Sequence, residues 1–314
     1  MGLSGFDNPD LKLILFGGKG GVGKTSCATA TAIGLAETYK TLIISTDPAH
    51  STSDSFDQSR KNGIHPVSGV ENLSLIEINA DDLYSEFKKE NEEELKNFFE
   101  TSTTLDAEDI NDLLRLSIPG IDEVMSLKAI IDLIEEGGYD KYVVDTAPTG
   151  HALRLIASPT LLDQWVKVAA KMRWKYRYMV TRFSGAYTED KTDALLLNLK
   201  KTVKKIERLF RDSRRCEFIP VCIPEAMAVL ETERLISNLR GYNLLVRQII
   251  MNNVMESEGC SFCRKRIIVQ QKYLMQMNRN FPKLNKVIIP LFENDVKGLV
   301  ELNQMKAFLF SQKR

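Results

Sequence analysis

Seven short runs of mostly apolar residues recur along the chain, and each gives way within two residues to glycine, proline or a polar side chain. Runs of this length and composition predict buried strands of a parallel sheet. Stretches with helical periodicity separate them, which indicates an α/β fold with a mostly parallel sheet flanked by helices. The strands are expected at residues 11–16, 40–45, 73–78, 139–144, 216–223, 244–251 and 286–289.

Two longer stretches follow the helical period and do not fit a minimal nucleotide-binding fold. In the first, apolar residues recur at i+3 or i+4 spacing, at Ile121, Val124, Leu127, Ile131 and Ile134. We therefore expect an α-helical subdomain formed by residues 81–136 and 158–211. The nucleotide-binding core is assigned to residues 1–80, 137–157 and 212–314, of which residues 1–10 are expected to be a mobile leader.

Composition narrows the class of protein. The 314 residues include 42 basic and 42 acidic side chains, a formal net charge of +0, so no overall attraction to nucleic acid is expected. No apolar stretch approaches the ~18 uncharged residues that a membrane-spanning helix needs. Five cysteines, an odd number, favour reduced thiols over a disulfide framework and predict a cytoplasmic protein.

The sequence GKGGVGKT directly follows the first predicted strand and precedes a predicted helix. Glycines at this spacing let backbone N–H groups face phosphate oxygens, and the helix N-terminus adds partial positive charge. Lys24 is expected on the β- and γ-phosphates, and the Thr25 hydroxyl on Mg²⁺. The predicted ATP-binding loop comprises Gly18, Lys19, Gly20, Gly21, Val22, Gly23, Lys24, Thr25 and Ser26.

Lys19 lies inside this loop, where Lys24 already serves the phosphates of the same chain. A lysine at this position can instead reach a nucleotide held by a second subunit, as an arginine finger does. Because the chain carries one such loop, this catalytic role requires a homodimer.

Two aspartates follow predicted strands, at the edge where α/β proteins bind their ligands. Asp47 is expected to orient the attacking water, although Asp47 before Pro48 is also typical of a helix cap. Asp145 is the second of these two aspartates, and it is expected to hold Mg²⁺ directly or through water. The predicted magnesium site thus comprises Thr25, Asp47 and Asp145.

Three motifs together resemble one family of P-loop NTPases in the SIMIBI class, which has a deviant Walker A motif. They are the GKGGVGKT loop, STDPAH at residues 45–50 and DTAPTGHALR at residues 145–154. The match is to the arsenical pump-driving ATPases, and within them to the tail-anchored-protein-targeting ATPases. The resemblance implies a switch II formed by Thr146, Ala147, Pro148, Thr149, Gly150 and His151. The family usually has Asn where this chain has Ser51.

The resemblance also implies further nucleotide contacts. Asn252 is expected on the adenine, and Glu225 is expected to reach the nucleotide from the other subunit. A proline-containing adenine loop is expected at Pro290, Leu291, Phe292 and Lys297.

Cys260 and Cys263 form a CxxC pair with no second pair or histidine nearby. Zinc prefers four tetrahedral ligands, so two pairs on the twofold axis of a homodimer would complete one site. A redox pair and an iron–sulfur site shared by two subunits are the alternatives. Similarity to the targeting ATPases in this region favours zinc.

The helical subdomain is expected either to pack on itself or to leave an apolar groove open for a partner. The resemblance favours a groove that binds the transmembrane helix of a tail-anchored protein. Closure of the dimer on ATP would shape this groove, and ATP hydrolysis would release the bound helix. The resemblance also implies a membrane receptor. The expected residues of the groove are Leu127, Ile131, Leu162, Trp165, Val166, Met172, Met179 and Leu196.

Two other functions stay open from the sequence. An arsenite-stimulated pump ATPase needs thiols near switch II, but none lies between Cys27 and Cys216. A partition or positioning ATPase would act on DNA or a membrane surface. The neutral net charge and the long apolar insertion argue against this function.

Overall fold

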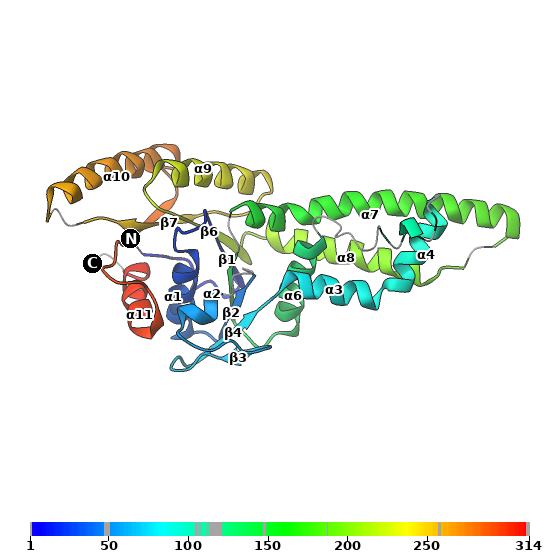
Figure 1. Cartoon of the computed structure of the whole chain (residues 1–314), viewed down its shortest axis with the longest axis horizontal. Helices are drawn as coiled ribbons and strands as arrows, with labels where there is room; N and C mark the ends of the chain where they lie inside the picture. Colours follow the sequence, from blue (N-terminus) through cyan, green and yellow to red (C-terminus); the bar gives the residue numbers. More distant parts are fainter. Residues whose placement is uncertain are drawn as a thin grey trace. The chain divides into compact units, whose positions relative to one another are not determined.

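The computed structural model describes residues 2–46, 51–103, 106, 108–110, 112, 121–146, 149–186, 188–256 and 259–311 (Figure 1). Within these ranges the side chains of residues 51, 102, 121–123, 149–162, 165 and 184 are not described. The chain divides into two compact units. The core unit comprises Met1–Ile78, Leu133–Leu153 and Leu209–Arg314, and the helical unit comprises Asn79–Asp132 and Arg154–Arg208.

An eight-stranded sheet forms the centre of the core unit, in the order β3-β4-β2-β5-β1-β6-β7-β8. Every pairing is parallel except that of β3 with β4. All residues of β1, β2, β5 and β6 are buried, which explains their continuous apolar character. The strands are β1 Leu13–Gly17, β2 Thr41–Ser45, β3 His65–Pro66, β4 Leu73–Glu77, β5 Lys141–Asp145, β6 Cys216–Cys222, β7 Gln248–Val254 and β8 Asn285–Pro290.

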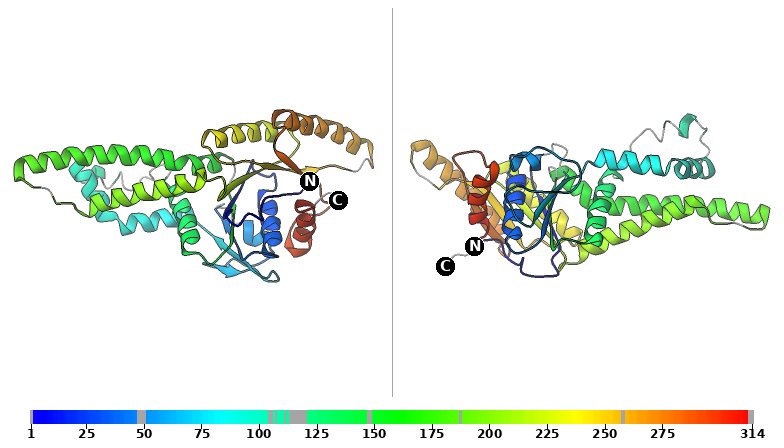
Figure 2. Two further views of the ribbon diagram at one scale, coloured as in Figure 1. Left: turned by 180° about the vertical axis from the view of Figure 1, so that it is seen from behind. Right: turned by 90° about the horizontal axis from the view of Figure 1, so that it is seen from below.

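Helices cover both faces of this sheet (Figures 1 and 2). Helices α1 (Lys24–Ala36) and α11 (Gly298–Leu309) lie side by side on one face, where the short α2 (Ser51–Ser55) also lies. Helices α9 (Ala226–Gly241) and α10 (Ser261–Asn280) cover the other face. The predicted α/β fold with a mostly parallel sheet is therefore confirmed.

The N-terminal residues pack against the core unit instead of forming the expected mobile leader. Leu3 and Phe6 are buried, and the Leu3 N–H donates to the Leu309 carbonyl at 2.6 Å. The Phe6 ring lies 6.0 Å from the ring of Phe310. The prediction was wrong because two apolar side chains suffice to anchor a short segment on α11.

Helical segments form the second unit, and three of them continue across its boundary into the core unit. They are α3 Ala80–Glu90, α4 Glu92–Ser102, α6 Ile121–Glu136, α7 Thr149–Ser184 and α8 Lys191–Arg211. Asn79 caps α3, because its side-chain oxygen accepts from the N–H groups of Asp81 and Asp82. The segments expected from the sequence, 81–136 and 158–211, end within about four residues of the observed bounds.

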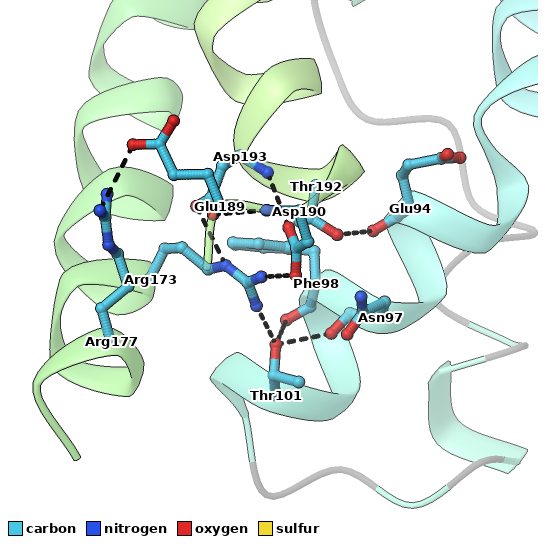
Figure 3. A network of polar contacts seen from close by, with 10 residues as sticks. All are labelled: Glu94, Asn97, Phe98, Thr101, Arg173, Arg177, Glu189, Asp190, Thr192 and Asp193. Carbon is cyan, nitrogen blue, oxygen red and sulfur yellow. Dashed lines mark hydrogen bonds and ion pairs between the residues drawn. The ribbon is translucent and has the colours of Figure 1, made fainter. Parts of the chain in front are cut away.

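Arg173 of α7 joins three helices of the helical unit (Figure 3). Its side chain is only 2% exposed, and it pairs with Asp190 and with Asp193 at the start of α8. Its Nη1 also donates to the Thr101 hydroxyl of α4 at 2.9 Å. A buried guanidinium needs such partners, so these bonds fix how α4, α7 and α8 pack together.

Candidate phosphate-binding and metal sites

The predicted phosphate loop connects the end of β1 at Gly17 to the start of α1 at Lys24. Gly23 precedes the helix in the left-handed conformation, with φ of 86°, and no side chain caps the helix N-terminus. The first N–H groups of α1 are thus left to bind an anion. Lys24, the first residue of α1, is buried at this point.

The loop is packed closely against the neighbouring strands β6 and β7. A Cβ atom on Gly18 would collide with the Val221 carbonyl oxygen, and one on Gly23 would collide with the Asn252 amide. Asn252 also donates from Nδ2 to the Val22 carbonyl at 2.9 Å. The structure therefore brings the predicted adenine residue Asn252 onto the loop itself.

The Asn252 amide oxygen supports the fit of a nucleotide. It is buried, and it accepts no hydrogen bond from the part of the chain that the structure describes. An asparagine oxygen can accept from the exocyclic amine of adenine. The glycine loop, the uncapped helix and this acceptor together fit ATP.

Asp145 is the last residue of β5, where it lies in register with Phe16 of β1 and Ser45 of β2. Its carboxylate is buried, and the Thr52 hydroxyl donates to it at 3.4 Å. Burial, and then the negative charge of Asp145, raise the pKa of the Cys27 thiol in α1. The carboxylate therefore lies beside the helix that also carries Thr25 and Ser26.

The start of the predicted switch II is tied to the end of β1. Thr146 donates from both its backbone N–H and its hydroxyl to the Phe16 carbonyl, and the hydroxyl bond is 2.7 Å long. Thr149, Gly150 and His151, the last three residues of the predicted switch II, belong to the first turn of α7. Asp47, Ala147 and Pro148 lie outside the described residues.

Lys19 has an acidic neighbour in its own chain that the sequence did not reveal. Its Nζ lies 3.6 Å from Oε1 of Glu231 on α9, and both side chains are partly exposed. No local motif marks Glu231, because the pair joins residues more than 200 positions apart. Lys19, which is expected to act on a second subunit, thus forms an ion pair within its own chain in this structure.

The other predicted nucleotide contacts pair with side chains elsewhere in the core unit. Arg266 of α10 pairs with Glu225, which precedes α9. Lys297 Nζ lies 2.9 Å from Oδ1 of Asp57, just beyond α2. This ion pair connects the expected adenine loop to the segment that follows the STDPAH motif.

The expected adenine loop begins where β8 ends, at Pro290. The Leu291 N–H donates to the carbonyl of Val254 in β7 at 2.9 Å. The Phe292 ring packs edge-on against Phe308 of α11, with the ring centres 5.9 Å apart. These contacts fix the loop beside the carboxyl ends of β7 and β8, the edge at which Asn252 lies.

Cys260 and Cys263 lie at the N-terminus of α10. Cys260 caps the helix, its sulfur accepts the Cys263 N–H at 3.2 Å, and the two sulfur atoms are 3.0 Å apart. The hydrogen bond from the Cys263 thiol lowers the pKa of Cys260 and raises the pKa of Cys263. Across the described residues, no group of three or more His, Cys, Asp or Glu side chains could hold a metal ion. Within these residues, Cys260 and Cys263 thus offer a metal two sulfur ligands.

An apolar pocket of about 270 Å³ lies within the helical unit, between side chains of α3, α4, α7 and α8. Of the expected groove residues, Val166, Met172 and Leu196 line it. Leu127 and Ile131 are instead buried in α6, and Met179 is exposed farther along α7. The side chains of Leu162 and Trp165 lie outside the described part of the structure.

The prediction missed every side chain that α3 and α4 contribute to this pocket. Leu95, Phe98 and Phe99 come from α4, and Phe87 comes from α3. The Phe98-Phe99 pair in an otherwise charged helix is the sequence signal that could have identified them.

Comparison with known proteins places the whole chain in one family. The model of the anion-transporting ATPase family matches residues 11–311. ATPase ASNA1 homolog 2 of Paramecium tetraurelia is 35% identical over 98% of this chain and 96% of its own length. ATPase GET3 of Komagataella phaffii is 33% identical over 96% of this chain and 91% of its own length. The chain therefore belongs to the anion-transporting ATPase family and is an ATPase of the GET3 type.

Proposed function

We propose that this ATPase works as a homodimer that binds the C-terminal transmembrane helix of tail-anchored proteins and delivers it to a membrane. The apolar pocket in the helical unit carries this proposal, because a nucleotide-binding core has no need of it. The ASNA1 and GET3 names of relatives aligned over nearly their full length support this function over an arsenite pump.

The phosphate site supplies the chemistry of the proposed cycle. The N–H groups of the loop and Lys24 bind the phosphates, while Thr25 and Asp145 would hold Mg²⁺ with Asp47. The ion would neutralise charge on the phosphate oxygens. Asp47 orients the attacking water, and Lys19 leaves Glu231 to reach the nucleotide of the other subunit.

The pocket is too small to hold a complete client helix. A spanning helix of ~20 residues is about 30 Å long, whereas a volume of about 270 Å³ accepts only a few side chains. We infer that the pocket binds part of the client and that the second subunit completes the groove.

Zinc would join the two subunits through Cys260 and Cys263 of each. The lowered pKa of Cys260 favours the thiolate form that zinc binds. Two sulfurs on a tetrahedral zinc lie about 3.8 Å apart, so the present 3.0 Å separation requires only small side-chain rotations. A redox pair remains the alternative use of these thiols.

The compartment proposed for this cycle is the cytoplasm, with a membrane receptor and no nucleic acid as partners. All five cysteines are free thiols, which a reducing compartment preserves. In the described part of the chain, no helix is both long and apolar enough to cross a membrane.

Client capture tests the targeting function directly. Asp47→Asn protein is incubated with ATP and a tail-anchored protein, or with a copy that lacks its apolar tail. We expect co-purification only with the intact tail. Capture of neither protein would contradict the targeting function, and stimulation of ATP hydrolysis by arsenite would then support the pump alternative.

A matched pair of variants tests the pocket. Leu196 lines it, whereas the next residue, Leu197, is exposed and does not. Leu196→Asp should reduce client capture strongly, because it places a charge against apolar side chains. Leu197→Asp should leave capture intact, and equal losses would contradict binding in the pocket.

Metal content and mass test the zinc bridge. Cys260→Ser with Cys263→Ser should remove zinc and shift the protein toward monomer in light scattering. Cys222→Ser is the control, because Cys222 is buried and burial raises its pKa to about 11. An unchanged dimer without zinc would argue against the bridge.

A further inference from the structure

The second half of α7 has an unusual distribution of charge. Between Asp163 and Glu189 the chain contains six lysine or arginine residues and no acidic residue. Lys171, Lys175 and Arg182 of this segment are exposed, and no ion pair engages them within the described residues. The neutral net charge of the whole chain conceals this concentration of positive charge.

Exposed aromatic side chains accompany these basic residues. Trp174 is 65% exposed and Tyr178 is 55% exposed, and Met179 beside them is 51% exposed. The two rings stack on each other, with centres 6.0 Å apart and an angle of 23° between their planes. Large apolar side chains exposed together in this way usually mark a binding surface.

These side chains share one side of the helix. At about 100° per residue, Lys171, Trp174, Lys175, Tyr178, Met179 and Arg182 all project within roughly 140° of one another. Arg173 projects from the opposite side, where the Asp190, Asp193 and Thr101 contacts hold it (Figure 3). The buried arginine therefore keeps the basic–aromatic face, as we name these six residues, directed away from the packed helices.

We propose that the basic–aromatic face of α7 docks onto the surface of an anionic lipid bilayer. Lysine and arginine side chains are attracted to acidic headgroups, while tryptophan and tyrosine place an apolar ring and a polar tip at headgroup level. The face thus offers both interactions that hold a helix on a bilayer surface.

Other occupants match the face less well. Single-stranded nucleic acid stacks its bases on free aromatic rings in a positively charged groove. Here the two rings stack on each other, on the outer side of a helix. An apolar client helix would leave three cations without counter-charges. An acidic bilayer satisfies both the charges and the rings.

Vesicle sedimentation tests the proposal with the full-length protein. The wild type should bind vesicles of phosphatidylcholine with 30% phosphatidylserine, should bind pure phosphatidylcholine weakly, and should dissociate at high salt. Because each basic residue near such a surface contributes about five-fold, Lys171→Glu, Lys175→Glu and Arg182→Glu together should weaken binding about 100-fold or more. Absence of wild-type binding to the acidic vesicles would overturn the proposal.

A second triple variant serves as the matched control. Lys200→Glu, Lys201→Glu and Lys204→Glu make the same change in net charge at exposed positions of α8, a different helix from the one that carries the aromatic rings. This variant should keep most of its vesicle binding. Equal loss in the two variants would overturn the proposal, because overall charge rather than this face would then explain binding.

Tryptophan fluorescence locates the contact. The chain has two tryptophans, so Trp165→Phe leaves Trp174 as the only one. Its emission should shift to the blue with phosphatidylserine vesicles and stay unchanged with phosphatidylcholine alone. Tighter binding to oligothymidylate than to vesicles would instead assign the face to nucleic acid and overturn the proposal. The test needs no client, so its outcome is independent of the targeting function.

Discussion

The core unit and the helical unit use buried polar side chains in different ways. In the core unit, Thr146 and Asn252 bond to backbone carbonyls at the ends of strands and in the phosphate loop. In the helical unit, Arg173 bonds to the side chains of other helices. Thr146 and Asn252 are thus positioned beside the candidate nucleotide site, whereas Arg173 positions the helices themselves. Variants in the core should change turnover, and variants around Arg173 should change stability.

The helical unit also segregates its charge between its two segments. The segment Asn79–Asp132 contains 15 acidic and 5 basic residues, a formal charge of −10, whereas Arg154–Arg208 contains 5 acidic and 13 basic residues, a formal charge of +8. The two segments nearly cancel, so the helical unit as a whole carries a formal charge of −2. Whole-chain charge therefore predicts partners poorly when segments of opposite sign fold into one unit.

Replacing Lys19 should have the largest effect in the core unit. Lys19→Ala should slow ATP hydrolysis by about 10³-fold or more, because a cation that stabilises the transition state of the other subunit is lost. Turnover at saturating ATP and thermal unfolding would be measured together, and the unfolding midpoint should stay unchanged.

Mixed dimers decide whether Lys19 acts on the other subunit. In a dimer of one Lys19→Ala and one Asp47→Asn subunit, one site retains Asp47 and receives Lys19 from its partner. We expect recovery of about half of the wild-type turnover, since one of two sites works. An inactive mixed dimer would show that Lys19 acts within its own chain.

Replacing Asp47 should produce the next largest effect. Asp47→Asn should retain ATP binding and lose hydrolysis by roughly 10²–10⁴-fold, because the attacking water is no longer oriented or deprotonated. Asp54→Asn is the control, since Asp54 is an exposed carboxylate in the nearby α2. Binding would be measured by calorimetry and hydrolysis by phosphate release. Near-normal turnover of the Asp47→Asn variant would contradict the catalytic role and would leave Asp47 only as a helix cap.

The sequence predicted the strands of the core better than the contacts of its side chains. The seven runs all correspond to strands. In β1, β2, β5 and β6, burial on both faces imposes a continuous apolar pattern. The two-residue β3 was missed, since two residues carry no periodicity. The Glu231 contact of Lys19 was missed because it depends on where α9 packs.

In the helical unit, periodicity predicted helices but not their polar contacts. Arg173 looks like one more basic residue of a basic segment, and nothing local indicates its burial. The pocket residues of α4 were missed for the same reason, because an isolated Phe98-Phe99 pair fits many packings. Local patterns determine the elements, while long-range packing decides which polar groups are buried.

Removing Arg173 should destabilise the helical unit and spare basal turnover. Arg173→Ala leaves carboxylates at the start of α8 without their buried partner, and Asp190 is partly exposed, so we expect a loss of about 3 kcal/mol. Faster hydrogen exchange in α7 and α8, measured on the intact protein, would report it. Arg177→Ala is the matched control: its pair with Glu189 is exposed and should cost about 0.5 kcal/mol. Equal destabilisation by Arg173→Ala and Arg177→Ala would mean that the buried Arg173 contacts stabilise the helical unit no more than an exposed ion pair does.

The smallest expected effect separates the Thr101 contact from the ion pairs. Thr101→Val removes the hydroxyl that accepts from Arg173 Nη1 and that donates to the Asn97 carbonyl. A buried guanidinium N–H then lacks its acceptor, so α4 should open more often, at a cost of about 1 kcal/mol. Thr101→Ser keeps the hydroxyl and should restore protection of the α4 amides from hydrogen exchange. If valine kept this protection and serine lost it, packing by the Thr101 methyl group rather than the Arg173 bond would hold α4 in place, and the anchor would consist of α7 and α8 alone.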